Sequence, residues 1–301
     1  LLKLPKNIRQ TGEKCIVGIE NKDLIYTSLI DKTEISTADN FTNKIKEFSV
    51  FLGSDAKTII QAFVGSDFLN NLEVLHIGVC SENTGHPLDY REIAKILSQV
   101  SFPNVHSFSF GEWLLISNSH CLYGKLGDIT QILSNMPKLN YLELGGQFEL
   151  NSPIVLNELT ELTIHLDDPM TAGNGGYISQ ETLNNLLNSK FPQLETVWLD
   201  LDLDWAVDDE FKRIDGLPTN CKDYKLTEDF INGKSWTNLK QIEFSGGYAQ
   251  GELDRFFNSE FPHCQNSCHP HLNNPNGEKG DNHGTIQCRT QTGYTKQTFI
   301  T

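Results

Sequence analysis

The sequence predicts an α/β leucine-rich-repeat solenoid, with a curved parallel β-sheet on its concave face and helices on its convex face. Three observations lead to this prediction: a helical segment followed at once by a strand, the recurrence of that unit, and a nearly constant distance between its halves. The unit is clearest at 183–201, where leucines first have helical spacing and then alternate as in a half-buried strand. Between them, Pro192 ends the helix, because proline disfavours the α conformation in the residue before it.

Both halves of the unit recur along the chain. The helical half has apolar residues at i, i+3 and i+4, namely Ile60/Phe63/Val64, Ile93/Ile96/Leu97, Ile129/Ile132/Leu133, Leu183/Leu186/Leu187 and Leu253/Phe256/Phe257. The strand half reads apolar-x-x-apolar-x-apolar, as in Leu72/Leu75/Ile77, Val105/Phe108/Phe110, Leu139/Leu142/Leu144, Leu159/Leu162/Ile164, Leu194/Val197/Leu199 and Leu239/Ile242/Phe244. Stacked repeats share one continuous core, so we assign 57–262 to a single solenoid with a polar insert at 204–225. The shorter step between the third and fourth strands predicts one abbreviated turn.

The two ends of the chain differ from the repeats. Residues 1–56 are interpreted as an N-terminal cap, because a solenoid must cover its first repeat. Within this cap, apolar residues at 41, 45, 48 and 52 have helical spacing, so a helix is expected over 41–52. After Pro262 no further strand pattern follows, and 263–301 is polar and without periodicity. We expect that segment to be an irregular or disordered tail.

The repeats also resemble those of a group of bacterial leucine-rich-repeat proteins. The resemblance lies in 127–144 (GDITQILSNMPKLNYLEL) and 186–194 (LLNSKFPQL). Similar repeats occur beside WGR domains in molybdate-metabolism-regulator-like proteins, although no WGR-type segment is visible here. The resemblance covers about 57–262, and it implies a repeat scaffold with no catalytic residues to assign.

Charge and cysteine content narrow the classes of partner and compartment. The formal net charge is −15, which argues against a nucleic-acid backbone or an anionic membrane as the main partner. The seven cysteines are scattered without a disulfide framework, which favours a reducing compartment. No apolar run approaches the roughly 18–20 residues that span a membrane. The sequence therefore predicts a cytoplasmic protein.

The tail contains the strongest candidate metal ligands. Zinc-type ligands at finger-like spacing are Cys264, Cys268, His283 and Cys288. A zinc module also needs apolar residues to pack, and between 265 and 285 Leu272 is the only aliphatic residue larger than alanine. We therefore expect no metal or other cofactor, with zinc as the alternative. No nucleophile-elbow or H-E-x-x-H motif is present, so no catalytic residue is assigned.

The candidate binding surface is formed by the strand residues that alternate with the core. The partner-binding residues expected there are Tyr141, Glu143, Glu161, His165, Trp198, Asp200 and Glu243. An exposed tryptophan and tyrosine on adjoining turns are typical of interface anchors. Packing of Trp198 under a flanking loop such as 204–225 is the open alternative.

The leading hypothesis is a non-enzymatic scaffold that binds a protein partner on its concave face, the commonest use of curved repeat arrays. There are two alternative hypotheses of function. A substrate-recruiting adaptor of the F-box-repeat type is disfavoured because 1–56 contains no F-box-like helical segment. An enzyme or metal protein would have its site in the Cys/His tail or in the insert.

Overall fold

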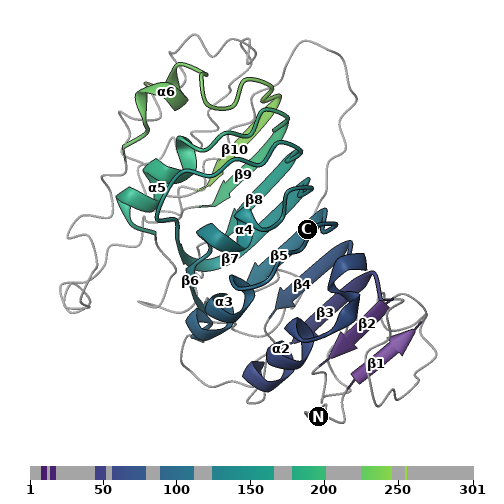
Figure 1. The fold of residues 1–301 in the computed structure, drawn as a ribbon. Coiled ribbons are helices and arrows are strands. Elements are labelled where there is room, and N and C mark those ends of the chain that lie inside the picture. Colours follow the sequence, from purple (N-terminus) through teal and green to yellow (C-terminus); the bar gives the residue numbers. More distant parts are fainter. Residues whose placement is uncertain are drawn as a thin grey trace, which may run out of the picture.

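The computed structural model describes residues 8–11, 14–17, 45–51, 56–78, 89–111, 124–165, 178–200, 225–245 and 255. These residues form an α/β protein built on one ten-stranded sheet (Figure 1). The strands lie in chain order: β1 (Ile8–Thr11), β2 (Lys14–Val17), β3 (Glu47–Phe51), β4 (Val74–Gly78), β5 (Ser107–Gly111), β7 (Tyr141–Glu149), β8 (Glu161–His165), β9 (Thr196–Asp200) and β10 (Gln241–Ser245). Strand β6 (Gly124–Asp128) pairs with the second half of β7.

Every strand pair is parallel except β1 with β2. Parallel neighbours need a crossover connection, and helices occur in most of these connections. They are α2 (Ala56–Val64), α3 (Arg91–Leu97), α4 (Thr130–Ser134), α5 (Gln180–Leu187) and α6 (Glu228–Ile231), with the 3-10 helix η1 (Asp67–Asn71). Helices α2 to α5 lie along one side of the sheet (Figure 1). The connection from β7 to β8 has no helix, which confirms that the shorter step between these strands leaves no room for one.

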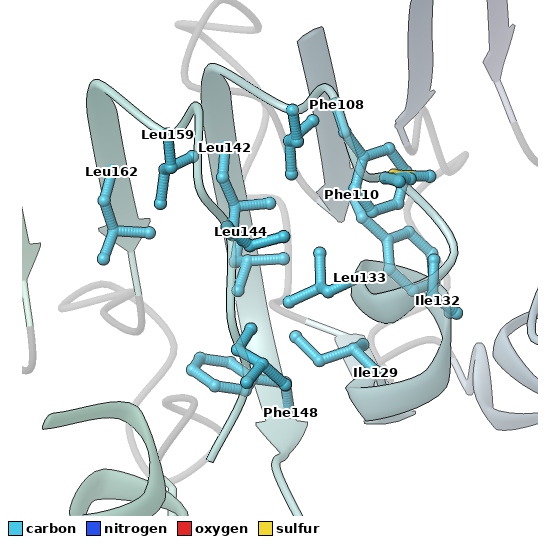
Figure 2. Close-up of a cluster of buried hydrophobic side chains, with 14 of the residues drawn as sticks. Phe108, Phe110, Ile129, Ile132, Leu133, Leu142, Leu144, Phe148, Leu159 and Leu162 are labelled. Atoms are coloured by element: carbon cyan, nitrogen blue, oxygen red, sulfur yellow. The ribbon is translucent and has the colours of Figure 1, made fainter. Parts of the chain in front are cut away.

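The core lies between the sheet and these helices. Every strand-triplet residue whose side chain is described is buried, as the sequence predicts. Leu142 and Leu144 of β7 extend toward Leu133 of α4 in the cluster shown in Figure 2. The prediction of six parallel strands in one sheet is confirmed, and their described triplet residues belong to one buried cluster.

Backbone hydrogen bonds also connect neighbouring strands at the residue that directly precedes each strand. At the strand starts, the N–H of Thr160 donates to the carbonyl of Asn140 (2.8 Å), that of Glu195 to Thr160 (2.9 Å), and that of Lys240 to Glu195 (2.8 Å). On the helical side, the Asn185 amide donates to the carbonyl of Leu150 (2.6 Å), one turn earlier in the chain. These bonds satisfy backbone groups outside the sheet ladder and help to hold successive strands in one register.

The helix expected over 41–52 is wrong, because residues 47–51 form β3. Phe48 and Val50 alternate into the core and pair in register with Leu75 and Ile77 of β4. The Phe48 ring also stacks on Phe63 of α2, with ring centroids 4.4 Å apart. A free sheet edge beside β4 and this aromatic contact outweigh the helical spacing, because strand preference depends on packing against neighbours. The parallel sheet thus continues into the segment assigned to the cap.

Several sequence-based predictions fall on residues that are not described. The helical triplet at 253–257 lies there apart from position 255, and so does the insert 204–225 apart from Lys225. The tail 263–301, with Cys264, Cys268, His283 and Cys288, also lies outside the described residues. In the described part of the chain, no helix has the length and apolar character needed to cross a membrane.

Candidate functional site: the ladder face

Six adjacent parallel strands place their non-core residues in three rows. The first row is Val74, Ser107, Tyr141, Glu161, Thr196 and Gln241, and the second is His76, Ser109, Glu143, Thr163, Trp198 and Glu243. The third row is Gly78, Gly111, Gly145, His165, Asp200 and Ser245. We call these eighteen positions the ladder face. The strict register follows from the period of two along each strand and the parallel pairing between strands.

Glu143 is the centre of the polar contacts on the ladder face. Its Oε2 accepts hydrogen bonds from the Ser109 hydroxyl (2.9 Å) and the Tyr141 hydroxyl (3.2 Å). Its Oε1 lies 3.9 Å from Nε2 of His165, and the Glu143 side chain is 19% exposed. One carboxylate oxygen is therefore held by two donors, while the other faces a histidine beyond hydrogen-bond distance.

His165 is buried at the end of β8, with 3% of its surface exposed. Its ring meets that of Trp198 edge to face, with centroids 4.9 Å apart and planes at 76°. To the residues that the structure describes, the imidazole makes no hydrogen bond. Burial lowers the pKa of His165 to about 4, because a buried site disfavours the charged imidazolium. At neutral pH the imidazole is uncharged and offers one donor and one acceptor.

Tyr141 stays a hydrogen-bond donor throughout the physiological pH range. Burial and the nearby carboxylates of Glu143 and Glu161 raise the pKa of the Tyr141 hydroxyl well above its usual range. Its proton is therefore retained for the bond to Glu143. This bond fixes the orientation of both side chains on the ladder face.

Trp198 is the large aromatic residue that the described sheet leaves accessible, with 39% of its surface exposed. Val155, before β8, is the other large apolar residue that is exposed in the described part of the chain, at 55%. Trp198 rests on His165 and still presents part of its indole outward. The alternative interpretation, in which 204–225 packs over Trp198, concerns residues that are not described apart from Lys225.

Five of the seven predicted partner-binding residues lie together on the ladder face and have described side chains. They are Tyr141, Glu143, Glu161, His165 and Trp198. Asp200 and Glu243 occupy the register positions beside His165 and Trp198, but their side chains lie outside the described part. Ser109 is a contributor that the sequence does not single out, because a serine within a strand carries no signal of its own. Only the register shows that it lies next to Glu143.

The arrangement of Ser109, Glu143 and His165 is not that of a Ser-His-carboxylate triad. In a Ser-His-carboxylate triad the histidine takes the serine proton, and the carboxylate orients the histidine. Here the carboxylate of Glu143 lies between Ser109 and His165, so the hydroxyl donates to the carboxylate. Among the described residues, no group of three or more His, Cys, Asp or Glu side chains is arranged to hold a metal ion. What the geometry does provide is a set of fixed acceptors beside an exposed indole.

Comparison with known proteins adds little to this geometry. No protein-family model matches the chain, and no curated protein is significantly similar to it. A Bacteroides fragilis protein, solved by a structural genomics consortium, aligns over 72% of this chain and 56% of its own length, with 16% identity and a TM-score of 0.46. The chain thus spans little more than half of that protein's length, and a likeness of this size carries no functional argument.

Burial of a neutral histidine predicts loss of stability in acid. The folded protein keeps His165 neutral down to about pH 4, whereas the unfolded chain binds a proton near the ordinary value of 6.5. Between these values the unfolded state binds more protons than the folded state. The free energy of unfolding should therefore decrease as the pH is lowered from 6.5 to 4, by at most about 3 kcal/mol. Urea unfolding measured from pH 7 to pH 4 tests this.

The matched variants for this measurement are His165→Gln and His106→Gln. His106 lies half-exposed directly before β5, so His106→Gln controls for the general effect of replacing one histidine. His165→Gln should remove most of the histidine-dependent slope. A slope that persists in full in His165→Gln would assign the acid sensitivity to other groups.

Proposed function

We propose that the protein is a leucine-rich-repeat solenoid, similar to those of bacterial leucine-rich-repeat proteins, and that it binds a protein partner on the ladder face without enzymatic activity. The observation that carries the proposal is the exposed indole of Trp198 beside the ordered group of Glu143, Tyr141 and His165. Repeat arrays use such extended sheet surfaces for recognition.

The composition of the two sheet faces supports this proposal. Parallel sheets in ordinary α/β proteins are covered on both faces, so their strands are apolar throughout. In this sheet one face carries leucine, isoleucine and phenylalanine, while the ladder face carries glycine, serine, threonine and glutamate. A polar face on a parallel sheet is expected of a solenoid, in which helices cover one side only.

Preorganisation of the polar groups also favours binding. Glu143 is held by Ser109 and Tyr141, and Trp198 packs on the buried ring of His165. Side chains that are already ordered lose little conformational entropy when a partner binds. The aromatic residues with surrounding carboxylates suit a partner that has a basic or polar patch around an apolar spot.

An affinity pull-down from the native host tests the proposal. The double variant Tyr141→Ala/Trp198→Ala should lose a specific partner that the unchanged protein captures, because aromatic anchors carry most of the binding free energy at interfaces. Circular dichroism and thermal unfolding should show that the variant remains folded. Val155→Ala is the matched control, since it truncates the other exposed apolar residue of the described part and should keep the partner.

One outcome would place the site elsewhere. If the double variant keeps every partner while deletion of 204–225 or 264–301 removes them, the ladder face is only a structural surface. A partner lost equally with Val155→Ala would indicate a non-specific loss of stability or solubility.

A further inference from the structure

Two hydrogen-bond acceptors of the ladder face lie close together. Oε2 of Glu143 is occupied by two donors, which leaves Oε1 available. Nε2 of His165 lies 3.9 Å from that oxygen, and the His165 side chain is 3% exposed. Both atoms can accept a hydrogen bond, so together they can receive a donor from a ligand.

A single nitrogen donor fits between these two acceptors. A nitrogen about 2.9 Å from each atom would satisfy both, since they lie 3.9 Å apart. The neutral imidazole accepts at Nε2 when its proton is on Nδ1. A positive charge on the donor would be stabilised by the Glu143 carboxylate, and the uncharged histidine would not repel it.

The charged residues at the ladder positions all have the same sign. The ladder positions include four acidic residues (Glu143, Glu161, Asp200 and Glu243) and no lysine or arginine. In register with them, the first lysine is Lys14 of β2, at the far end of the sheet. At the strand starts, just outside the ladder face, Lys46 and Lys240 are already paired with Glu73 (3.3 Å) and Glu195 (2.6 Å).

We propose that the ladder face binds the cationic side chain of a lysine or arginine from a basic segment of the protein partner. Its N–H groups donate to Oε1 of Glu143 and Nε2 of His165, and its aliphatic stem lies against the exposed indole of Trp198. Contact between a cation and a tryptophan ring adds to such binding. The proposal rests on the proposed function of the ladder face and specifies the chemistry of its partner.

Nuclear magnetic resonance with small probes tests this directly. The blocked amino acids N-acetyl-lysine methylamide and N-acetyl-arginine methylamide are titrated into the ¹⁵N-labelled protein, with N-acetyl-glutamine methylamide as the neutral control. At least one cationic probe should shift the His165 imidazole and Trp198 indole signals saturably, and the neutral probe should not. Equal shifts with the neutral probe, or none with either cation, would overturn the proposal.

The variant Glu143→Gln separates a specific cation site from general attraction. Its amide oxygen can still accept from Ser109 and Tyr141, but its amide N–H₂ would replace the open acceptor with a donor. Affinity for the cationic probe should fall on the order of tenfold or more. Glu73→Gln removes the same charge at a strand start, outside the ladder face, and should change affinity little. An equal loss in both variants would show that only net charge matters.

The two proposals fail in different ways. If Tyr141→Ala/Trp198→Ala abolishes partner capture but Glu143→Gln does not, and the cationic probes cause no shifts, the partner uses the ladder face without a cation at Glu143. If the double variant keeps the partner, the proposed function itself is wrong.

Discussion

Replacing Leu142 with aspartate should lower the free energy of unfolding by about 4 kcal/mol or more. Leu142 is 1% exposed and lies between Phe108 of β5 and Leu162 of β8 in the sheet register. A carboxylate at that position would have neither water nor a described cation beside it, and the leucine packing would be lost (Figure 2). Urea unfolding followed by circular dichroism measures the loss.

The control is the same new residue on the other face of the sheet. Ser107 of β5 is half-buried and pairs in register with Val74 and Tyr141 on the ladder face. Ser107→Asp should cost about 1 kcal/mol or less, as surface substitutions generally do. Equal losses at Leu142 and Ser107 would contradict the assignment of one face to the core and the other to solvent.

Replacing Gly111 with alanine should cost about 3 kcal/mol or more. Gly111 has φ +105, a conformation that side-chain-bearing residues rarely adopt, and an added Cβ would lie 1.9 Å from the carbonyl oxygen of Gly145. That oxygen belongs to the neighbouring strand, so relief would require β5 and β7 to separate. Thermal and urea unfolding should both show the loss.

Gly65 provides the matched control for Gly111→Ala. It is exposed directly after α2 and does not have a positive φ. Gly65→Ala should therefore change stability by less than about 1 kcal/mol. If Gly111→Ala were equally mild, the close approach of β5 and β7 at Gly145 would be wrong.

Most of the parallel strands and the helices between them could be predicted because their signal is local. Each strand has its buried residues at fixed spacing, and the helical leucines precede it by a similar distance. Strand β3 was not predictable in this way, since residues 45 to 52 also match a helical face and only pairing with β4 decides between the two. Strand β6 contains two glycines in five residues, and it forms because β7 extends past Gly146 to pair with it. Neither β3 nor β6 can therefore be recognised from its own residues alone.

The candidate site could be predicted as a surface but not as a set of contacts. Alternation along the strands places Tyr141, Glu143 and Trp198 on one face. The hydrogen bond from Ser109 to Glu143 joins residues that are 34 apart in the chain, so it depends on the register between β5 and β7. The burial of His165 under Trp198 likewise comes from two neighbouring strands. Partner binding by Asp200 and Glu243 stays a prediction.

The central claim is that partners contact the ladder face, and site-specific photo-crosslinking in the native host tests it most directly. A benzophenone amino acid is placed at Trp198 in one variant and at Val155 in another, the two large exposed apolar positions of the described chain. We expect a discrete crosslinked protein from position 198 and none from position 155. A discrete crosslink from position 155 with none from position 198 would contradict it.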